Sequence, residues 1–214
     1  MKRKFLFAFL NPEHEQQVAA VLRERAPHIA VSLSSEVQPE FREYERLSTT
    51  VLNAYLQPVM CHYLETLENG VVERAPNSTL GMNQSSGGLM SPQRARELPV
   101  RTALSGPAAG TVGAAHVARQ IDRRNVITLD VGGTSADVAL IRDFKIDIAF
   151  DRDVAGFPIR LPCVDVETVG AGGGSIAWFD RDGLLKVGPI SAGADPGPAC
   201  YGKGGDRPTV TDAN

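Results

Sequence analysis

The segment VITLDVGGTSADVALI, residues 126–141, places an acid, two glycines and a hydroxyl between two apolar runs. Apolar, β-branched runs on both sides of a Gly-Gly pair predict two strands joined by a tight turn. Asp130 would end the first strand, and Gly132 and Gly133 would let the backbone come close to a ligand. The segment therefore predicts a β-hairpin whose turn presents bare backbone.

The predicted turn has the chemistry of a phosphate clamp. Consecutive peptide N–H groups at such a turn form an anion-binding nest, and Thr134 adds a hydroxyl donor. Asp130 and, less directly, Asp137 on the returning strand can hold a Mg²⁺ ion or a water that bridges phosphate oxygens. No Gly-Lys-Ser/Thr follows, and a strand rather than a helix comes next, so neither a Walker A loop nor a dinucleotide fingerprint fits. An ordinary Gly-Gly hairpin without a ligand is the alternative.

A second glycine-rich loop, residues 170–175, follows an apolar strand that carries Asp165 and Glu167. Its glycines suit a close approach to a nucleotide or substrate, and a tight bulged hairpin is an equally good interpretation. The candidate contacts are Gly172, Gly173, Gly174 and Ser175.

The first half of the chain predicts a βαβ unit followed by helices. Residues 5–10 and 28–37 are expected to be strands on either side of a helix that begins at Asn11 and Pro12. Apolar residues spaced by three and four predict a long helix over residues 39–64, which Pro58 should kink or split.

The second half is expected to contain two further helices and mostly strands. Ser91 should open a short helix, and residues 99–120 predict a strand, a turn and a helix of small residues. Strands are expected in residues 145–154 and on both sides of the glycine-rich loop, with a turn at Asp182 and Gly183. Asp212 should be the N-cap of a last helix.

Composition excludes several classes of protein. The chain has 214 residues, 43% hydrophobic residues and a formal net charge of −3, which argue for a globular core and against a general binder of nucleic acid or anionic membranes. No segment is apolar enough to cross a membrane. Three widely spaced cysteines predict reduced thiols in a cytoplasmic protein, and four histidines lack the spacing of metal ligands.

Longer blocks of the chain resemble known families. The small-residue helix followed by the hairpin resembles the second half of the nucleotide site in actin, sugar-kinase and chaperone ATPases. The blocks LNPEHE, PVRTALSGPAAGTVGA, LDVGGTSADVALI, TVGAGGGSIAWFD and VGPISAGADPGPACYGKGGDRPTVTDAN are similar, in this order, to the hydantoinase A/5-oxoprolinase family. EVQPEFREYERLSTTVLNAYLQPVM, residues 36–60, matches the same family.

The resemblance implies an α/β fold: part of a ribonuclease H-like, actin-like ATPase lobe with a mixed sheet and flanking helices. Family members carry an amino-terminal lobe with a Gly-Gly-Thr loop of its own. Residues 1–25 are therefore expected to be a remnant of that lobe. Residues 26–214 would be the first part of the hydantoinase A/oxoprolinase domain, truncated at its carboxyl end. This internal fragment would hold one phosphate loop of two.

The resemblance also implies a function, that of a hydrolase subunit that uses ATP and Mg²⁺ to open cyclic amides such as hydantoin or 5-oxoproline. In that mechanism ATP phosphorylates the amide oxygen and water opens the ring, with a hydantoinase B-like subunit or domain as partner. Gly132, Gly133 and Thr134 would clamp phosphate, Asp130 and Asp137 would be catalytic, and Asp130 would bind the metal. One alternative is an acetone or acetophenone carboxylase subunit. Another is an inactive fragment with residual nucleotide binding or partner docking.

Overall fold

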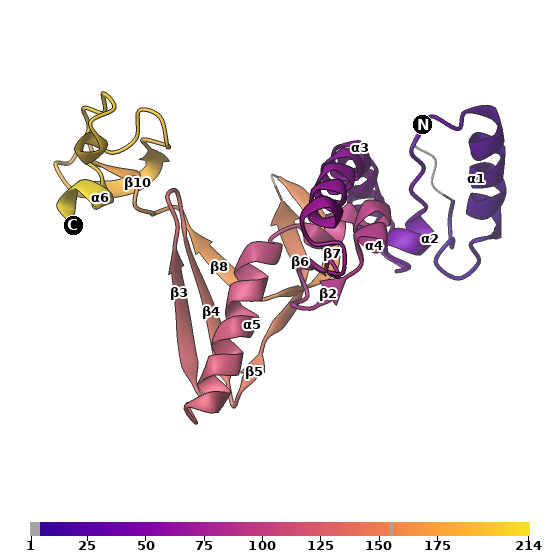
Figure 1. Cartoon of the computed structure of the whole chain (residues 1–214), viewed down its shortest axis with the longest axis horizontal. Helices are drawn as coiled ribbons and strands as arrows, with labels where there is room; N and C mark the ends of the chain where they lie inside the picture. The colour runs from indigo at the N-terminus through magenta and orange to yellow at the C-terminus, as the bar shows by residue number, and fades with distance from the viewer. Residues whose placement is uncertain (1–4, 155) are drawn as a thin grey trace. The chain divides into compact units, whose positions relative to one another are not determined.

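The computed structural model describes residues 5–154 and 156–214, which form two compact units. Of the described residues, 5–109, 148–154 and 156–164 belong to the first unit, and 110–147 and 165–214 belong to the second. Figure 1 shows the elements of both units. Helix α5 (Ser105–Gln120), the predicted small-residue helix, begins in the first unit and continues into the second. The turn predicted at Ser105, Gly106 and Pro107 is wrong, because these residues are the first ones of the helix.

The first unit is mainly helical, with two small antiparallel pairs of strands. Its buried residues include one packed hydrophobic cluster of Val37, Leu98, Val100, Leu161 and Cys163. Its elements are α1 (Glu13–Arg25), α2 (Ser34–Val37), α3 (Glu43–Arg74), β1 (Met82–Asn83), β2 (Leu89–Met90), α4 (Pro92–Glu97), the 3₁₀ helix η1 (Pro99–Thr102), β6 (Ile148–Val154) and β7 (Phe157–Val164).

The predicted βαβ unit is wrong, although its helix, α1, is present. Residues 5–10 form turns, in which the peptide N–H groups of Leu10 and Asn11 both donate to the Phe7 carbonyl. Residues 28–37 contain the short helix α2 instead of a strand. An apolar run becomes a strand only when another strand accepts its hydrogen bonds. Among the described residues, no strand pairs with either of these two segments.

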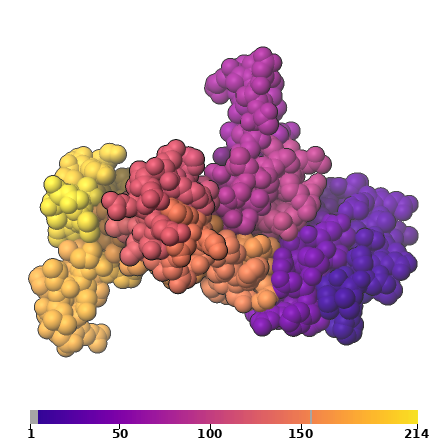
Figure 2. All heavy atoms as spheres, turned by 90° about the horizontal axis from the view of Figure 1, so that it is seen from below, coloured from indigo at the N-terminus to yellow at the C-terminus, as the bar shows by residue number. Residues whose placement is uncertain are grey.

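Helix α3 confirms the predicted long helix, but it begins at Glu43 rather than at residue 39 and continues to Arg74. It runs through Pro58 without a break, so the predicted split is wrong. Tertiary contacts hold the helix on the amino-terminal side of this proline: the Thr49 hydroxyl accepts a hydrogen bond of 3.0 Å from the peptide N–H of Arg160, and the Asn53 amide donates to the Glu97 carbonyl at 3.0 Å. The carboxyl end of α3 stands out from the rest of the first unit (Figure 2). No described helix combines the length and apolarity that a membrane span requires.

Helix α4, capped by the Ser91 hydroxyl, confirms the predicted short helix. The strand expected after it is wrong, because residues 99–102 form η1. Pro99 lacks the N–H group that a strand ladder needs, and the N–H group of Val100 donates to the Asn53 side chain at 3.2 Å.

The second unit is built around the predicted hairpin of β3 (Val126–Val131) and β4 (Ala136–Arg142). Strand β4 is also paired with β8 (Val166–Val169) and β5 (Lys145–Ile146). A separate pair joins β9 (Ser175–Phe179) to β10 (Leu185–Ser191). The helices and strands confirm the α/β class, but every pairing of the described strands is antiparallel, so the expected mixed sheet is not found in this part of the chain.

The carboxyl-terminal segment contains the 3₁₀ helix η2 (Ala199–Tyr201) and the short helix α6 (Val210–Ala213). The predicted N-cap at Asp212 is wrong: Thr209 is the N-cap and Asp212 is the third helical residue. The Asp212 carboxylate accepts from the Thr209 N–H group at 2.8 Å, which completes a capping box. The helix therefore begins three residues earlier than predicted.

Candidate phosphate-binding site

The turn between β3 and β4 is short and closed by a backbone hydrogen bond. The ladder pairs Val131 with Ala136, and the N–H group of Gly132 donates to the Ser135 carbonyl at 2.8 Å. Thr134 lies in this turn between two adjacent antiparallel strands, as the sequence predicts. The predicted hairpin is confirmed.

Three consecutive peptide N–H groups of this turn are free to bind an anion. No described residue accepts a hydrogen bond from the N–H group of Gly133, Thr134 or Ser135. Gly133 and Thr134 are also exposed. Successive unpaired donors at a turn form the nest that binds phosphate groups.

Two carboxylates lie beside the turn on one face of the sheet. Asp130 is paired with Asp137 across the β3–β4 ladder, and Asp137 is paired with Thr168 across the β4–β8 ladder. The Thr168 hydroxyl donates to the Asp137 carboxylate at 2.6 Å. Side chains directly opposite each other in such ladders lie about 5 Å apart. The two acids are therefore neighbours, as a shared cation requires.

This arrangement fits a Mg²⁺ ion that is held partly by a nucleotide. Among the described residues, no group of three or more histidine, cysteine, aspartate or glutamate side chains could hold a metal ion. Mg²⁺ usually binds one or two carboxylates and completes its octahedron with phosphate oxygens and water. Asp130 and Asp137 match that limited contribution from the protein.

The two glycine-rich segments pack against each other through their backbones. The N–H group of Gly173 donates to the Gly132 carbonyl at 2.9 Å, and that of Gly174 donates to the Gly133 carbonyl at 2.7 Å. Ser175 is fully buried, and its hydroxyl accepts a hydrogen bond of 2.8 Å from the Gly172 N–H group. The structure thus brings both predicted segments together.

Two threonines at the site have no signal in the sequence. Thr168 orients Asp137, and Thr211 in α6 donates to the Gly173 carbonyl from both its N–H group and its hydroxyl, each at 2.8 Å. In Figure 1 the turn of the β3–β4 hairpin reaches the segment that carries β10 and α6. The contact of Thr168 depends on the strand register of β4 and β8, and the contact of Thr211 joins residues 38 positions apart in the chain.

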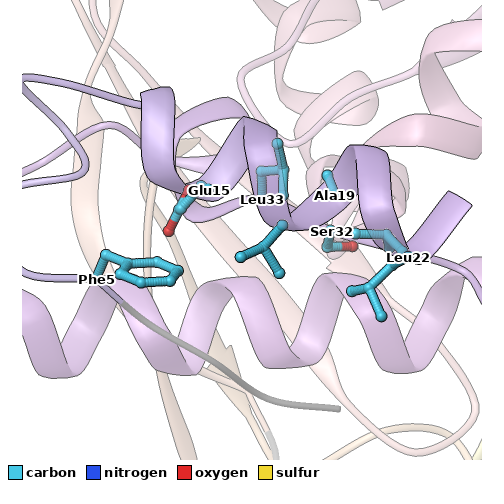
Figure 3. Close-up of a pocket in the computed structure, with 8 residues that line it drawn as sticks. Phe5, Glu15, Ala19, Leu22, Ser32 and Leu33 are labelled. Carbon is cyan, nitrogen blue, oxygen red and sulfur yellow. The ribbon is translucent and has the colours of Figure 1, made fainter.

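A cavity of about 40 Å³ in the first unit is a weaker candidate for a ligand-binding site. Figure 3 shows Glu15 and Ala19 of α1 beside Phe5 and Leu33 in its wall. The Glu15 carboxylate accepts hydrogen bonds from the Ser34 hydroxyl at 2.6 Å and from the Ser35 N–H group and hydroxyl at 3.0 and 2.9 Å. The one acid of this mostly apolar cavity is therefore already engaged in tying α1 to α2.

Cys163 and Cys200 do not have the environment of a nucleophile. Burial raises the pKa of the Cys163 thiol in the core of the first unit. A hydrogen bond to the Asp212 carboxylate raises the pKa of the exposed Cys200 thiol. Both shifts favour the thiol over the reactive thiolate, so inert side chains are the better interpretation.

Comparison with known proteins identifies the family of the chain. The family model described as hydantoinase/oxoprolinase matches residues 46–214. The chain therefore belongs to the hydantoinase/oxoprolinase family, as its sequence blocks predict.

Named relatives extend the similarity to almost the whole chain. Caprolactamase subunit alpha of Pseudomonas jessenii is 46% identical over 210 residues, which cover 98% of this chain and 30% of the relative. The 5-oxoprolinase of Saccharomyces cerevisiae is 41% identical over 214 residues, which cover 98% of this chain and 16% of the relative. The chain spans less than a third of the length of each of these two relatives.

Two solved structures share the fold. The crystal structure of the ATP-dependent caprolactamase from Pseudomonas jessenii superposes with a TM-score of 0.79 at 45% identity, over 98% of this chain and 30% of the other. The nucleotide-free structure of an acetone carboxylase, described with ATP-dependent acetone carboxylation, superposes with a TM-score of 0.76 at 31% identity. That match covers 97% of this chain and 30% of the carboxylase chain.

Proposed function

We propose that this chain is part of an ATP-dependent hydrolase subunit that opens cyclic amides of the hydantoin or 5-oxoproline type. Family membership supports the proposal, as do relatives named caprolactamase and 5-oxoprolinase. The observation that carries it is the turn itself, where three unpaired N–H groups lie next to two opposed carboxylates. This combination suits a polyphosphate and its bound cation.

Each site residue has a role in the proposal. The free N–H groups of Gly133, Thr134 and Ser135 and the Thr134 hydroxyl hold a phosphate group. The N–H group of Gly132, predicted to be part of the clamp, instead closes the turn on the Ser135 carbonyl. Asp130 and Asp137 hold Mg²⁺. ATP supplies the phosphoryl group that activates the resonance-stabilised amide. Because phosphoryl transfer depends on positioning and on neutralised charge, residues that fix phosphate oxygens and a cation are the contribution expected of a protein. Nucleotide binding by Gly172, Gly173, Gly174 and Ser175 stays a prediction.

We propose that the fold is part of a ribonuclease H-like lobe in which residues 1–25 continue an amino-terminal lobe and residues 26–214 begin the hydantoinase A/oxoprolinase domain. A hydantoinase B-like subunit or domain is the proposed partner. The relative named caprolactamase subunit alpha, one subunit of its enzyme by name, supports such a partner. The proposed location is the cytoplasm.

Ketone carboxylation is the second candidate function. The similarity to the acetone carboxylase structure supports it. The turn of residues 132–135, called the phosphate turn below, would bind the phosphates of ATP in either reaction. A fragment that binds nucleotide or docks to a partner without turnover is the third.

The test begins with calorimetric titration of the chain with Mg-ATP and with AMP, which lacks the β- and γ-phosphates. Binding of Mg-ATP but not AMP, weakened at least about tenfold by Asp130→Ala, is the expected result. ATP turnover is then measured with hydantoin, 5-oxoproline, caprolactam, or acetone with bicarbonate, to separate hydrolase from carboxylase. Equal affinity of wild type and Asp130→Ala for Mg-ATP would refute the assigned site.

A further inference from the structure

We propose that Gly172 and Thr211 are positioning residues that aim the free N–H groups of the phosphate turn. Gly172 lies against the turn. Thr211 donates a hydrogen bond to Gly173 of the glycine-rich loop, residues 170–175, which is called the glycine loop below. The identity of the ligand rests on the proposed function, whereas the positioning of the free N–H groups is tested independently of it.

The contact at Gly172 leaves no room for a side chain. A Cβ atom at this position would lie 2.6 Å from the Gly132 carbonyl oxygen and 2.7 Å from the peptide nitrogens of Thr134 and Ser135. The three obstructing atoms are backbone atoms of the turn, and two of them belong to the free donors. Gly172 does not have a positive φ, so close packing rather than backbone conformation demands glycine here.

Two hydrogen bonds fix the direction of the donors. The carbonyls of Gly132 and Gly133 point toward the glycine loop, because they accept from the N–H groups of Gly173 and Gly174. In a planar trans peptide the N–H group points opposite to the carbonyl of the same unit. The N–H groups of Gly133 and Thr134 therefore point away from the glycine loop, where a phosphate can reach them.

Thr211 secures the glycine loop in turn. Its N–H group and its hydroxyl both donate to the Gly173 carbonyl at 2.8 Å, and the Ala192 N–H group donates to the Gly174 carbonyl at 2.8 Å. The capping box of Thr209 and Asp212 fixes the start of the helix that carries Thr211. A continuous set of hydrogen bonds thus runs from α6 through the glycine loop to the turn.

The test uses ¹⁵N-labelled chain and two readouts: the backbone order parameters of Gly133 and Thr134, and the affinity for Mg-pyrophosphate. Thr211→Val removes only the hydroxyl donor. It should lower both order parameters and weaken binding about 3- to 10-fold, and Thr211→Ser should restore both. Thr66→Val is the matched control, because it removes a hydroxyl bond to the His62 carbonyl within a helix of the first unit.

A second pair of variants probes the contact itself. Gly172→Ala should weaken Mg-pyrophosphate binding more than tenfold, whereas Gly113→Ala, where a Cβ meets nothing within 4 Å, should leave it unchanged. If Gly172→Ala does not fold, the Thr211→Val variant alone tests the positioning role. Unchanged order parameters and affinity in Thr211→Val would overturn the inference. A wild-type chain that binds no Mg-pyrophosphate, but whose turn loosens in Thr211→Val, would overturn the proposed function and leave the positioning role supported.

Discussion

Thr168 donates a hydrogen bond of 2.6 Å to Asp137, which lies directly opposite Asp130 in the β3–β4 ladder. Strand β8 thereby orients one of the two acids that flank the β3–β4 turn. The hydroxyl leaves the other carboxylate oxygen of Asp137 available to a cation.

Asp130→Asn should stabilise the ligand-free chain while abolishing Mg²⁺-dependent nucleotide binding. Like charges directly opposite each other in a ladder repel, and removing one should raise the free energy of unfolding by about 0.5 kcal/mol. Urea unfolding with and without Mg-ATP measures both effects. The control is Asp182→Asn, in an exposed turn of the second unit, and it should change neither. Loss of stability in Mg²⁺-free buffer would contradict the predicted repulsion.

Thr168→Val should weaken Mg²⁺-dependent nucleotide binding by about tenfold, because residues that orient metal ligands typically contribute at least this much to affinity. Thr168→Ser keeps the hydroxyl and should bind like the wild type. Calorimetric titration with ATP at fixed Mg²⁺ concentration measures the difference. Equal affinities of the valine and serine variants would show that Asp137 needs no orientation by Thr168.

Glu15→Gln should destabilise the first unit. The buried carboxylate accepts three hydrogen bonds, and an amide would turn one acceptor oxygen into a donor that faces the donors of Ser34 and Ser35. A cost of about 1–3 kcal/mol is expected from a mismatched buried group. Urea unfolding followed by circular dichroism measures it. The exposed Glu24 of the same helix offers the control, and a Glu24→Gln variant as unstable as Glu15→Gln would refute the argument.

Asp212 should make the carboxyl-terminal segment sensitive to acid. Hydrogen bonds from the Cys200 N–H group and thiol, and from Thr209, hold the pKa of this carboxyl well below its ordinary value of 3.8. A lowered folded-state pKa stabilises the fold above the unfolded-state pKa, and this contribution is lost as the pH falls through the folded-state pKa. The difference in melting temperature between wild type and Asp212→Asn should be constant from pH 7 to 5 and shrink below pH 4. A difference that grows on acidification would have the wrong sign.

The three cysteines should react with iodoacetamide in the order Cys61, Cys200, Cys163. Cys61 is exposed, the pKa of Cys200 is raised by its hydrogen bond to Asp212, and that of Cys163 is raised by burial. Because the thiolate is the reactive form, Cys163 should react on the order of a hundred times more slowly than Cys61. Mass spectrometry of timed samples at pH 7.5 gives the three rates, and Asp212→Asn should accelerate Cys200 alone. Rapid labelling of Cys163 in the folded chain would contradict its burial.

Local sequence predicted the elements that depend on local chemistry. The hairpin of residues 126–142 follows from two β-prone runs and a Gly-Gly turn, and α4 follows from a serine cap and a proline at the first helical position. The strands expected at residues 5–10 and 28–37 failed because an apolar run does not specify its partner. In the folded chain, the Ser34 and Ser35 side chains bind Glu15 and start a helix instead.

By itself, the sequence determined that residues 126–141 form a hairpin with bare backbone at its turn and an acid on each side, because side-chain type and glycine placement act within a few residues. It also identified the family. Only the tertiary structure decided that Gly172, Gly173 and Gly174 pack on that turn, that Thr168 faces Asp137, and that Thr211 holds the loop. These contacts join segments far apart in the chain. The glycine contacts are made by backbone atoms, which are the same in every residue, and the threonine contacts depend on strand register and on the placement of α6, so no local residue pattern encodes which groups meet.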